Sequence, residues 1–276
     1  MDEMKCFHPH PALEPYVQSY VSLKLPQVLT RPDIETTPPL PTKAIMFWFS
    51  KTPFRVYNRY QMDEVSPRAF IIPQYTCPNN CVHYGANEFF TITFWPGKMR
   101  HLFRFPWLEV LNHYIPIEDT GDQSFIDFSH RIEDTPSLTE RVRICDNFLL
   151  SRLPQSPLQL DGMQYVVNNL VANPTLKVRD LAKKMFLSER QFRRRYKETF
   201  GISPAGHRRL FRFLKAYNWL KTRPADTLMD ATEQFGYTDP SHLYKDFLHY
   251  TDESPIQYMK KTLLHKYTNW RENHWE

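Results

Sequence analysis

Two stretches of this chain repeat one design, and this repeat constrains the fold more than any other feature. Residues 176–204 and 228–258 each read as a short helix, a tight turn and a second helix. At a constant interval of 51 residues, four matches link the stretches: Phe192 with Leu243, Arg194 with Lys245, Tyr196 with Phe247, and Ser203-Pro204 with Ser254-Pro255. We also pair Ala182 with Ala231. Repetition at this scale predicts two copies of a helix-turn-helix unit.

In the first copy, the start of the second helix is marked by a capping signal. Ser188 and Gln191 have the S-x-x-Q spacing of a capping box, in which each side chain satisfies a backbone donor of the first turn. Phe192, Tyr196 and Phe200 then recur every four residues and predict one buried face. The rest of this helix is rich in arginine.

A long helix is predicted between the two copies, over about 204–222. It begins at Ser203-Pro204, and a shorter helix at about 161–172 precedes the first copy. Five apolar residues form the predicted buried stripe of the long helix: Leu210, Phe213, Leu214, Tyr217 and Leu220. The proline-rich, uncharged segment 153–159 is the best linker candidate, so we place a domain boundary near 155.

The N-terminal part has a different character. Residues 1–105 hold short aromatic and β-branched segments bounded by Pro, Asn, Asp or Gly, which predicts a β-sandwich or barrel. Residues 106–152 have helical periodicity. The expected fold class is therefore α+β and multidomain, with domains at 1–155 and 156–276 and an all-α second domain.

Charge is distributed unevenly. Residues 177–276 carry 20 Lys and Arg against 12 Asp and Glu, a net +8, whereas residues 1–176 carry 15 against 18, a net −3. A local positive excess attracts polyanions, although it also occurs on ordinary solvated surfaces. The four cysteines are scattered, the N-terminus lacks an export signal and no long apolar run is present, so we expect a cytoplasmic protein with no membrane partner.

The paired units, the Ser-Pro after each recognition helix and Phe235-Gly236-Tyr237 before the second resemble the AraC/XylS family of bacterial transcription regulators. The resemblance covers about residues 160–262, and more loosely the N-terminal part is similar to the cupin-like sensor domains of some of these regulators. It implies a sequence-specific DNA-binding regulator that lays two recognition helices, about 189–199 and 240–249, into successive major grooves. It further implies double-stranded DNA as a partner, a small-molecule effector in the N-terminal domain and a homodimer.

Site residues follow from the same resemblance. The expected base contacts are Arg190, Gln191, Arg193, Arg194, Ser241, His242 and Lys245, and the expected phosphate contacts are Lys183, Lys184, Lys197 and Arg208. Because arginine can bind guanine in a bidentate manner, the first helix should dominate base readout. The ligand-binding residues of the N-terminal domain are not predicted.

Two positions depart from the family pattern, and one arginine has a simpler explanation. Phe186 stands at a turn position that is commonly Gly, so it must accept a positive φ or the turn must change. Asp252 replaces the usual Gly after the second recognition helix. Arg195 is expected to form an ion pair with Glu198, three residues on.

The alternative is a metal-dependent, cupin-type enzyme with an appended DNA-binding domain. Cys77, Cys81 and His83 lie close in sequence, but no second cysteine pair completes a four-ligand zinc site. His8 and His10 are not followed by the carboxylate of a catalytic cupin, and no glycine-rich phosphate loop or nucleophile elbow occurs. We therefore expect no catalytic residues, no metal and no cofactor.

Overall fold

The computed structural model describes the backbone of residues 3–50, 54–61, 64–103, 105, 111–154, 162–223 and 227–260. The chain divides into two compact units. The first comprises Met1–Ile34, Thr42–Tyr75 and Asn79–Gln159, and the second contains Leu160–Glu276 with the short segments Glu35–Pro41 and Thr76–Pro78. The predicted boundary at 155/156 lies outside the described residues.

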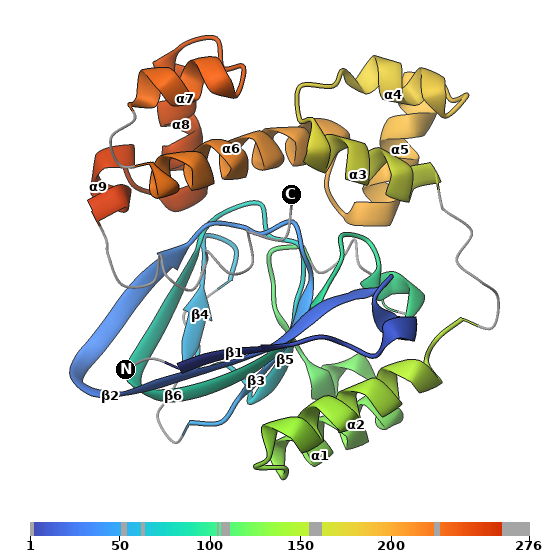
Figure 1. Cartoon of the computed structure of the whole chain (residues 1–276), viewed down its shortest axis with the longest axis vertical. Coiled ribbons are helices and arrows are strands. Elements are labelled where there is room, and N and C mark those ends of the chain that lie inside the picture. Colours follow the sequence, from blue (N-terminus) through green and yellow to red (C-terminus); the bar gives the residue numbers. More distant parts are fainter. Residues whose placement is uncertain are drawn as a thin grey trace. The chain divides into compact units, whose positions relative to one another are not determined.

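The first unit is built on an antiparallel sheet (Figure 1). Within the described residues it contains β1 (Glu3–Phe7), β2 (Val17–Thr37), β3 (Ala44–Trp48), β4 (Arg55–Tyr57), β5 (Ala69–Ile72), β6 (Asn79–Phe94) and β7 (Ile115–Pro116). Their order is β1-β2-β6-β3-β5-β7, and β4 pairs with β6. The long strand β6 pairs with β4 near its start and with β3 near its end. The predicted β-rich N-terminal region is thus confirmed.

Alternation along the strands gives the sheet two apolar faces. Ile45 and Phe47 of β3 belong to one core, whereas Met46 and Trp48 contact a second. Neighbouring β6 alternates in the same way, because side chains of successive strand residues point to opposite faces. Most aromatic residues of these strands are buried in the two cores.

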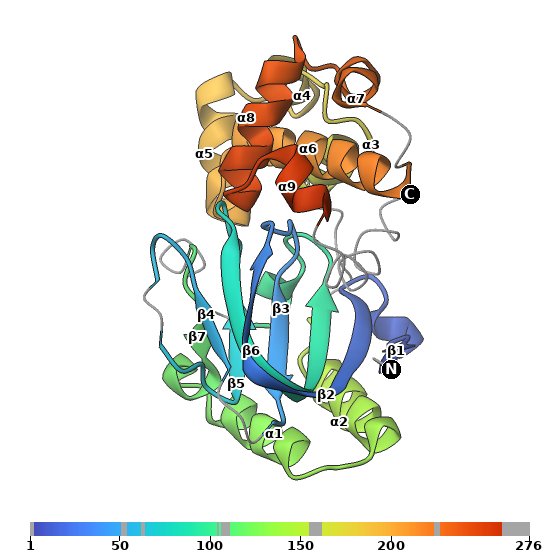
Figure 2. The same cartoon turned by 90° about the vertical axis from the view of Figure 1, so that its left-hand side faces the viewer.

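Two helices, α1 (Gln123–Glu133) and α2 (Leu138–Ser151), follow the strands and lie against the first core (Figure 2). The helical prediction is correct for these two. It is wrong further upstream, where Ile115–Pro116 is a strand paired with β5 and Ile117–Thr120 is a 3-10 helix. Pro116 has no amide hydrogen to donate to a helix. Ile115 is buried from its position in the strand, and Ile117 is buried from the 3-10 helix. Residues 106–110 lie outside the described part.

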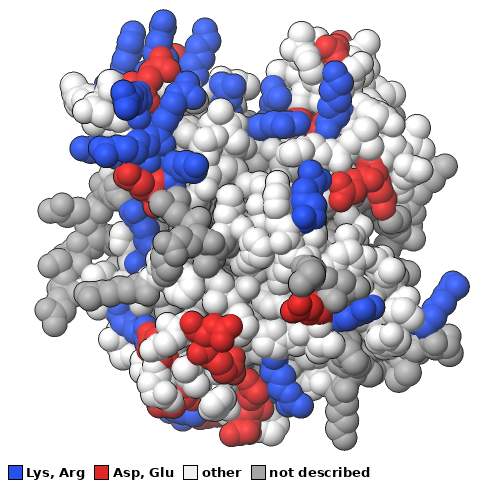
Figure 3. Space-filling model, turned by 180° about the vertical axis from the view of Figure 1, so that it is seen from behind, with Lys and Arg blue, Asp and Glu red and all other residues white. Residues whose placement is uncertain are grey.

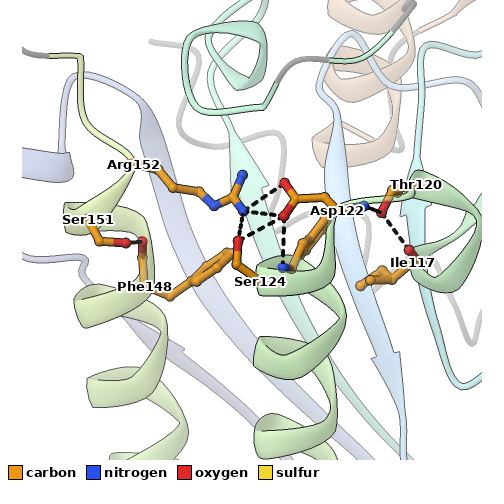
Figure 4. A network of polar contacts seen from close by, with 8 residues as sticks. Ile117, Thr120, Asp122, Ser124, Phe148, Ser151 and Arg152 are labelled. Carbon is orange, nitrogen blue, oxygen red and sulfur yellow. Dashed lines mark hydrogen bonds and ion pairs between the residues drawn. The ribbon is translucent and has the colours of Figure 1, made fainter.

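The start of α1 and the end of α2 are joined by a polar network (Figure 4). The Arg152 guanidinium donates to Asp122 Oδ1 at 2.8 Å and also to the Ser124 hydroxyl. Asp122 caps α1 by accepting from the Phe125 amide at 3.1 Å. Burial opposes ionisation of Asp122, but hydrogen bonds from Ser124 and Arg152 outweigh it and hold its pKa below the ordinary value. The guanidinium also lies 4.6 Å from the centroid of the Phe148 ring of α2. Because Arg152 ends α2 while Asp122 and Ser124 begin α1, the network fixes the two helices to each other.

The second unit is helical, as predicted. It contains α3 (Gly162–Ala172), α4 (Val178–Lys184), α5 (Glu189–Phe200), α6 (Pro204–Thr222), α7 (Leu228–Gln234), α8 (Pro240–Thr251) and α9 (Pro255–Lys260). Figure 1 shows α6 as one continuous helix, with α3–α5 at one end and α7–α9 at the other. In the described part of the chain, no helix is both long enough and apolar enough to cross a membrane.

Candidate nucleic-acid interface

The first helix-turn-helix unit, α4 with α5, is held by an apolar core that it shares with α3. Leu181 and Ala182 of α4 and Phe192, Tyr196 and Phe200 of α5 are buried in this core. The predicted capping box is confirmed, since Ser188 Oγ accepts from the Gln191 amide at 3.3 Å and Gln191 Oε1 accepts from the Ser188 amide at 3.1 Å. This cap sets where α5 starts and therefore which residues face outward.

The turn before α5 contains a strained residue. Phe186 has φ = 52°, and its residue surface is 97% exposed, so the side chain gains almost nothing from burial. The turn keeps its shape and Phe186 accepts the positive φ. Gly236 holds the equivalent place in the second unit with φ = 65°.

We expect Phe186→Gly to stabilise the chain by about 0.5–1 kcal/mol. Removing the left-handed strain stabilises the folded state by about 1–2 kcal/mol. The greater conformational freedom of glycine stabilises the unfolded state and offsets about half of this gain. Urea unfolding of the two proteins would measure the difference. Asp252→Gly, at φ = 56°, is the matched control with a smaller expected gain, because aspartate tolerates this conformation better. A loss of stability in Phe186→Gly would contradict the strain argument.

The second unit, α7 with α8, repeats the first with one correction to the predicted alignment. In the first turn the Leu187 amide donates to the Ala182 carbonyl at 3.1 Å, and in the second the Tyr237 amide donates to the Thr232 carbonyl at 3.0 Å. The structural equivalent of Ala182 is therefore Thr232 and not Ala231. The second turn contains one residue more than the first. Equivalent residues are therefore 50 positions apart before this extra residue and 51 positions apart in the recognition helices.

Helix α6 connects the units and buries the predicted stripe. All five residues of that stripe are buried in the core shared with α7 and α8. Near its start, His207 of α6 shares a hydrogen bond of 2.8 Å with the Tyr196 hydroxyl. Each end of α6 thus packs against one of the two units.

A buried carboxylate ties α8 to α6, and sequence reasoning missed it. Asp246 is 3% exposed; it accepts from Arg209 Nε at 2.7 Å and from the Tyr237 hydroxyl at 2.9 Å. Arg212 Nη2 lies 3.7 Å from Asp246 Oδ2, the oxygen that accepts from Tyr237, and the Arg212 guanidinium lies 3.9 Å from the centroid of the Tyr237 ring. This contact could have been predicted from two features of the sequence. Arg209 and Arg212 are three residues apart on one predicted helix, and Asp246 lies on the apolar side of α8.

The predicted base-reading residues of α5 are exposed. Arg190 and Arg194 lie four residues apart on the face opposite the core. Arg193 lies on one flank of this face and pairs with Glu189 at 3.1 Å. Gln191 is exposed but committed to the capping box.

The ion pair predicted for Arg195 is wrong. Glu198 lies instead 3.9 Å from Arg194 Nε, since residues four apart on a helix face each other at least as well as residues three apart. Exposed pairs of this kind contribute about 0.3–0.5 kcal/mol. That is less than the 1–3 kcal/mol of a bidentate guanine contact, so Arg194 remains available to DNA.

The predicted residues of α8 are also exposed, but less basic. Ser241, His242 and Lys245 all lie at the surface. His242 Nδ1 is 3.2 Å from Asp239 Oδ2, and Asp239 caps α8 by accepting from the His242 amide at 3.0 Å.

The residues predicted to contact phosphates differ in their exposure and in their contacts with the protein. Lys183, Lys184 and Lys197 are exposed. Arg208 is half-buried and donates to the Leu176 carbonyl at 3.4 Å, so part of its function is to join α6 to the segment before α4.

The two helix-turn-helix units differ in net charge. Residues 178–200 carry eight Lys and Arg against three Asp and Glu, a net +5, whereas residues 228–251 carry one against four, a net −3. Figure 3 shows the result, with Lys and Arg side chains gathered over the α4–α5 end of the second unit, at the upper left of that view. The first helix-turn-helix unit therefore has the surface that a nucleic acid would approach.

The residues considered for metal binding do not assemble into a site. The described residues contain no group of three or more His, Cys, Asp and Glu placed to hold a metal ion. None of the four cysteines forms a disulfide with another, and Cys77 is buried and Cys81 partly buried.

Comparison with known proteins agrees with this geometry. A family model described as a helix-turn-helix domain matches residues 181–261. Among solved structures, an apo ToxT variant from Vibrio cholerae is 10% identical, with a TM-score of 0.50 over 87% of this chain and 96% of that one. Fatty acid-bound ToxT from Vibrio cholerae is 10% identical with a TM-score of 0.45 over 94% of each chain, and the AraC-like transcriptional activator CuxR is 12% identical with a TM-score of 0.35 over 79% of this chain and 84% of CuxR. A search of curated proteins found no significant match.

At these identities the solved structures bear on the fold alone, and the ToxT variant shares the two-domain architecture. The helix-turn-helix match and the paired units define the class: this chain is a DNA-binding regulator of transcription. Within that class, its C-terminal domain is of the AraC type, as the sequence resemblance predicted.

Proposed function

We propose that the chain binds a specific DNA site by placing α5 and α8 in successive major grooves, with α5 making the dominant base contacts. The observation that carries this proposal is the exposed Arg190/Arg194 face of α5 on a unit of net charge +5. Helix α6 has 19 residues and is therefore about 28 Å long. That length is comparable to the groove repeat of about 34 Å.

The test is preference for a specific site. Full-length protein should bind its own upstream region, or a duplex selected from a random pool, at least 100-fold more tightly than random DNA at moderate salt. Equal affinity for all duplexes would refute sequence-specific regulation. Because binding to phosphates depends steeply on salt, the comparison must be made at one fixed salt concentration.

We further propose that the N-terminal unit, which contains the β-sheet, binds a small effector that shifts the population of DNA-binding states. Support comes from buried polar groups on the neighbouring strands β2 and β6. The Ser19 hydroxyl of β2 and the Thr93 hydroxyl of β6 find no hydrogen-bond partner among the described residues. Such groups are costly to bury unsatisfied, and an effector with hydrogen-bonding groups would satisfy them.

Thr93→Val tests this assignment because it removes the hydroxyl and keeps the shape. Thr93 is fully buried, so we expect the effector-free protein to gain about 1 kcal/mol of stability in urea unfolding. The response of DNA binding to an effector found by screening should weaken in the same variant. Lower stability of the variant would mean that the hydroxyl already has a partner and would remove Thr93 from the proposed site.

The homodimer and the cytoplasmic location remain part of the proposal. Light scattering of the purified chain, with and without a selected duplex, measures whether one or two copies bind.

A further inference from the structure

The two recognition helices carry different chemistry at equivalent places. Counting 51 residues from α5 to α8 places Ser241 where Arg190 stands, Tyr244 at Arg193 and Leu248 at Lys197. Lys245 alone keeps a positive charge, at the place of Arg194. In the preceding helices, Glu233 and Gln234 stand where Lys183 and Lys184 do, at an interval of 50.

The outward face of α8 is therefore largely neutral and partly apolar. Tyr244 and Leu248 are each 41% exposed and, being four residues apart, lie next to each other on this face. Ser241 lies one turn before them. A face of this composition gains little from phosphates, whose attraction depends on positive charge.

Such a face can still distinguish base pairs. In the major groove thymine presents a C5-methyl group, which cytosine lacks, and apolar side chains recognise it by contact. We propose that the second helix-turn-helix unit reads thymine methyl groups through Tyr244 and Leu248. The first helix-turn-helix unit then supplies the guanine and phosphate contacts.

This inference rests on the proposed function, since it requires that α8 enter a groove. The repeat supports DNA as the occupant of this face, because α8 holds the place in its unit that α5 holds in the basic unit. Asp239 and Asp230 do not oppose this placement strongly, since both carboxylates accept hydrogen bonds from backbone amides of their own helix starts. The buried Asp246 is compensated by Arg209 and Arg212 from α6.

The experiment compares thymine with deoxyuridine, which differs only by the missing C5-methyl group. A duplex selected from a random pool on the full chain is prepared unmodified and with uracil replacing thymine in one half, in the other half or in both. We expect uracil in the half bound by α8 to weaken binding about fourfold for each methyl group contacted. This ratio should stay the same between low and high salt, because the lost contact is apolar.

Variants assign the effect to the two side chains. In the double variant Tyr244→Ala, Leu248→Ala, the unmodified duplex should bind more weakly and the uracil effect should disappear. The matched control is Lys197→Ala, at the place in α5 that Leu248 holds in α8. It should lower affinity and reduce the salt slope by about one while leaving the uracil effect intact.

Several outcomes would overturn the inference. These are equal binding of all four duplexes, a uracil effect that survives in the double variant, and a selected half-site without thymine. If deleting the second half-site changes nothing, the face of α8 contacts another molecule, and the inference fails. Failure of the proposed function looks different, since no selected duplex would then be preferred over random DNA.

Discussion

Replacing both Arg190 and Arg194 by alanine is expected to weaken binding of a specific duplex by about 2–6 kcal/mol, from about 1–3 kcal/mol for each bidentate guanine contact. The two side chains lie on adjacent turns of α5, on the face opposite the buried Phe192 and Tyr196. Neither arginine is committed to the fold, because the one ion pair that either of them forms with the described residues is the 3.9 Å Arg194–Glu198 contact at the surface. Fluorescence anisotropy with a selected duplex and with random DNA measures the loss and its sequence dependence.

Arg195→Ala is the matched control for this pair. Arg195 is also exposed on the same helix but lies on the flank beside the buried Thr199. It should cost well under 1 kcal/mol, and mainly through general electrostatics. Equal losses from Arg195→Ala and from the double variant would show that α5 binds by charge alone and does not read bases.

Asp246→Ala is expected to destabilise the α6–α8 region by about 3 kcal/mol. The substitution leaves the buried Tyr237 hydroxyl without its acceptor and removes the carboxylate that Arg209 and Arg212 face. Breaking a buried ion pair typically costs 3–5 kcal/mol. The lower end applies here because the Arg209 side chain is 42% exposed and can regain water.

Amide hydrogen exchange measures this effect in the full chain. Exchange from α8 should become faster by about 100-fold, since each 1.4 kcal/mol corresponds to a factor of ten. The amides of β3 and β6 serve as the internal reference and should not change. Arg193→Ala, which breaks only the exposed pair with Glu189, should leave exchange from both regions unchanged. Unaltered protection of α8 in Asp246→Ala would show that apolar packing alone holds this helix.

The helical half was predictable because local signals and packing agree there. Phe192, Tyr196 and Phe200 mark one face, Ser188 marks where the helix begins, and the glycine at 201 ends it with φ = 81°. The predicted limits of the long helix, 204–222, match α6 because Ser203-Pro204 is an unambiguous start signal. Here the sequence pattern and the tertiary environment require the same residues in the same conformation.

The errors occur where contacts distant in sequence decide. Ile115–Pro116 was predicted as helical from its apolar neighbours, but it forms a strand because β5 offers an edge to pair with. Arg195 could not be separated from Arg194 as the partner of Glu198, since both spacings are compatible with a helix. No sequence pattern predicted that Asp246 of α8 is buried, because its burial depends on two arginines more than thirty residues earlier in the chain.

The single helix α6 also bears on the spacing between the two halves of a DNA site. Both helix-turn-helix cores include residues of α6, with Phe211 in the first and Leu214 in the second, and no flexible joint separates them. Adding one residue to an α-helix rotates everything beyond it by about 100° and advances it by about 1.5 Å. If both recognition helices enter grooves as we propose, the spacing between the two halves of a DNA site is set by this helix and should be the same at every promoter.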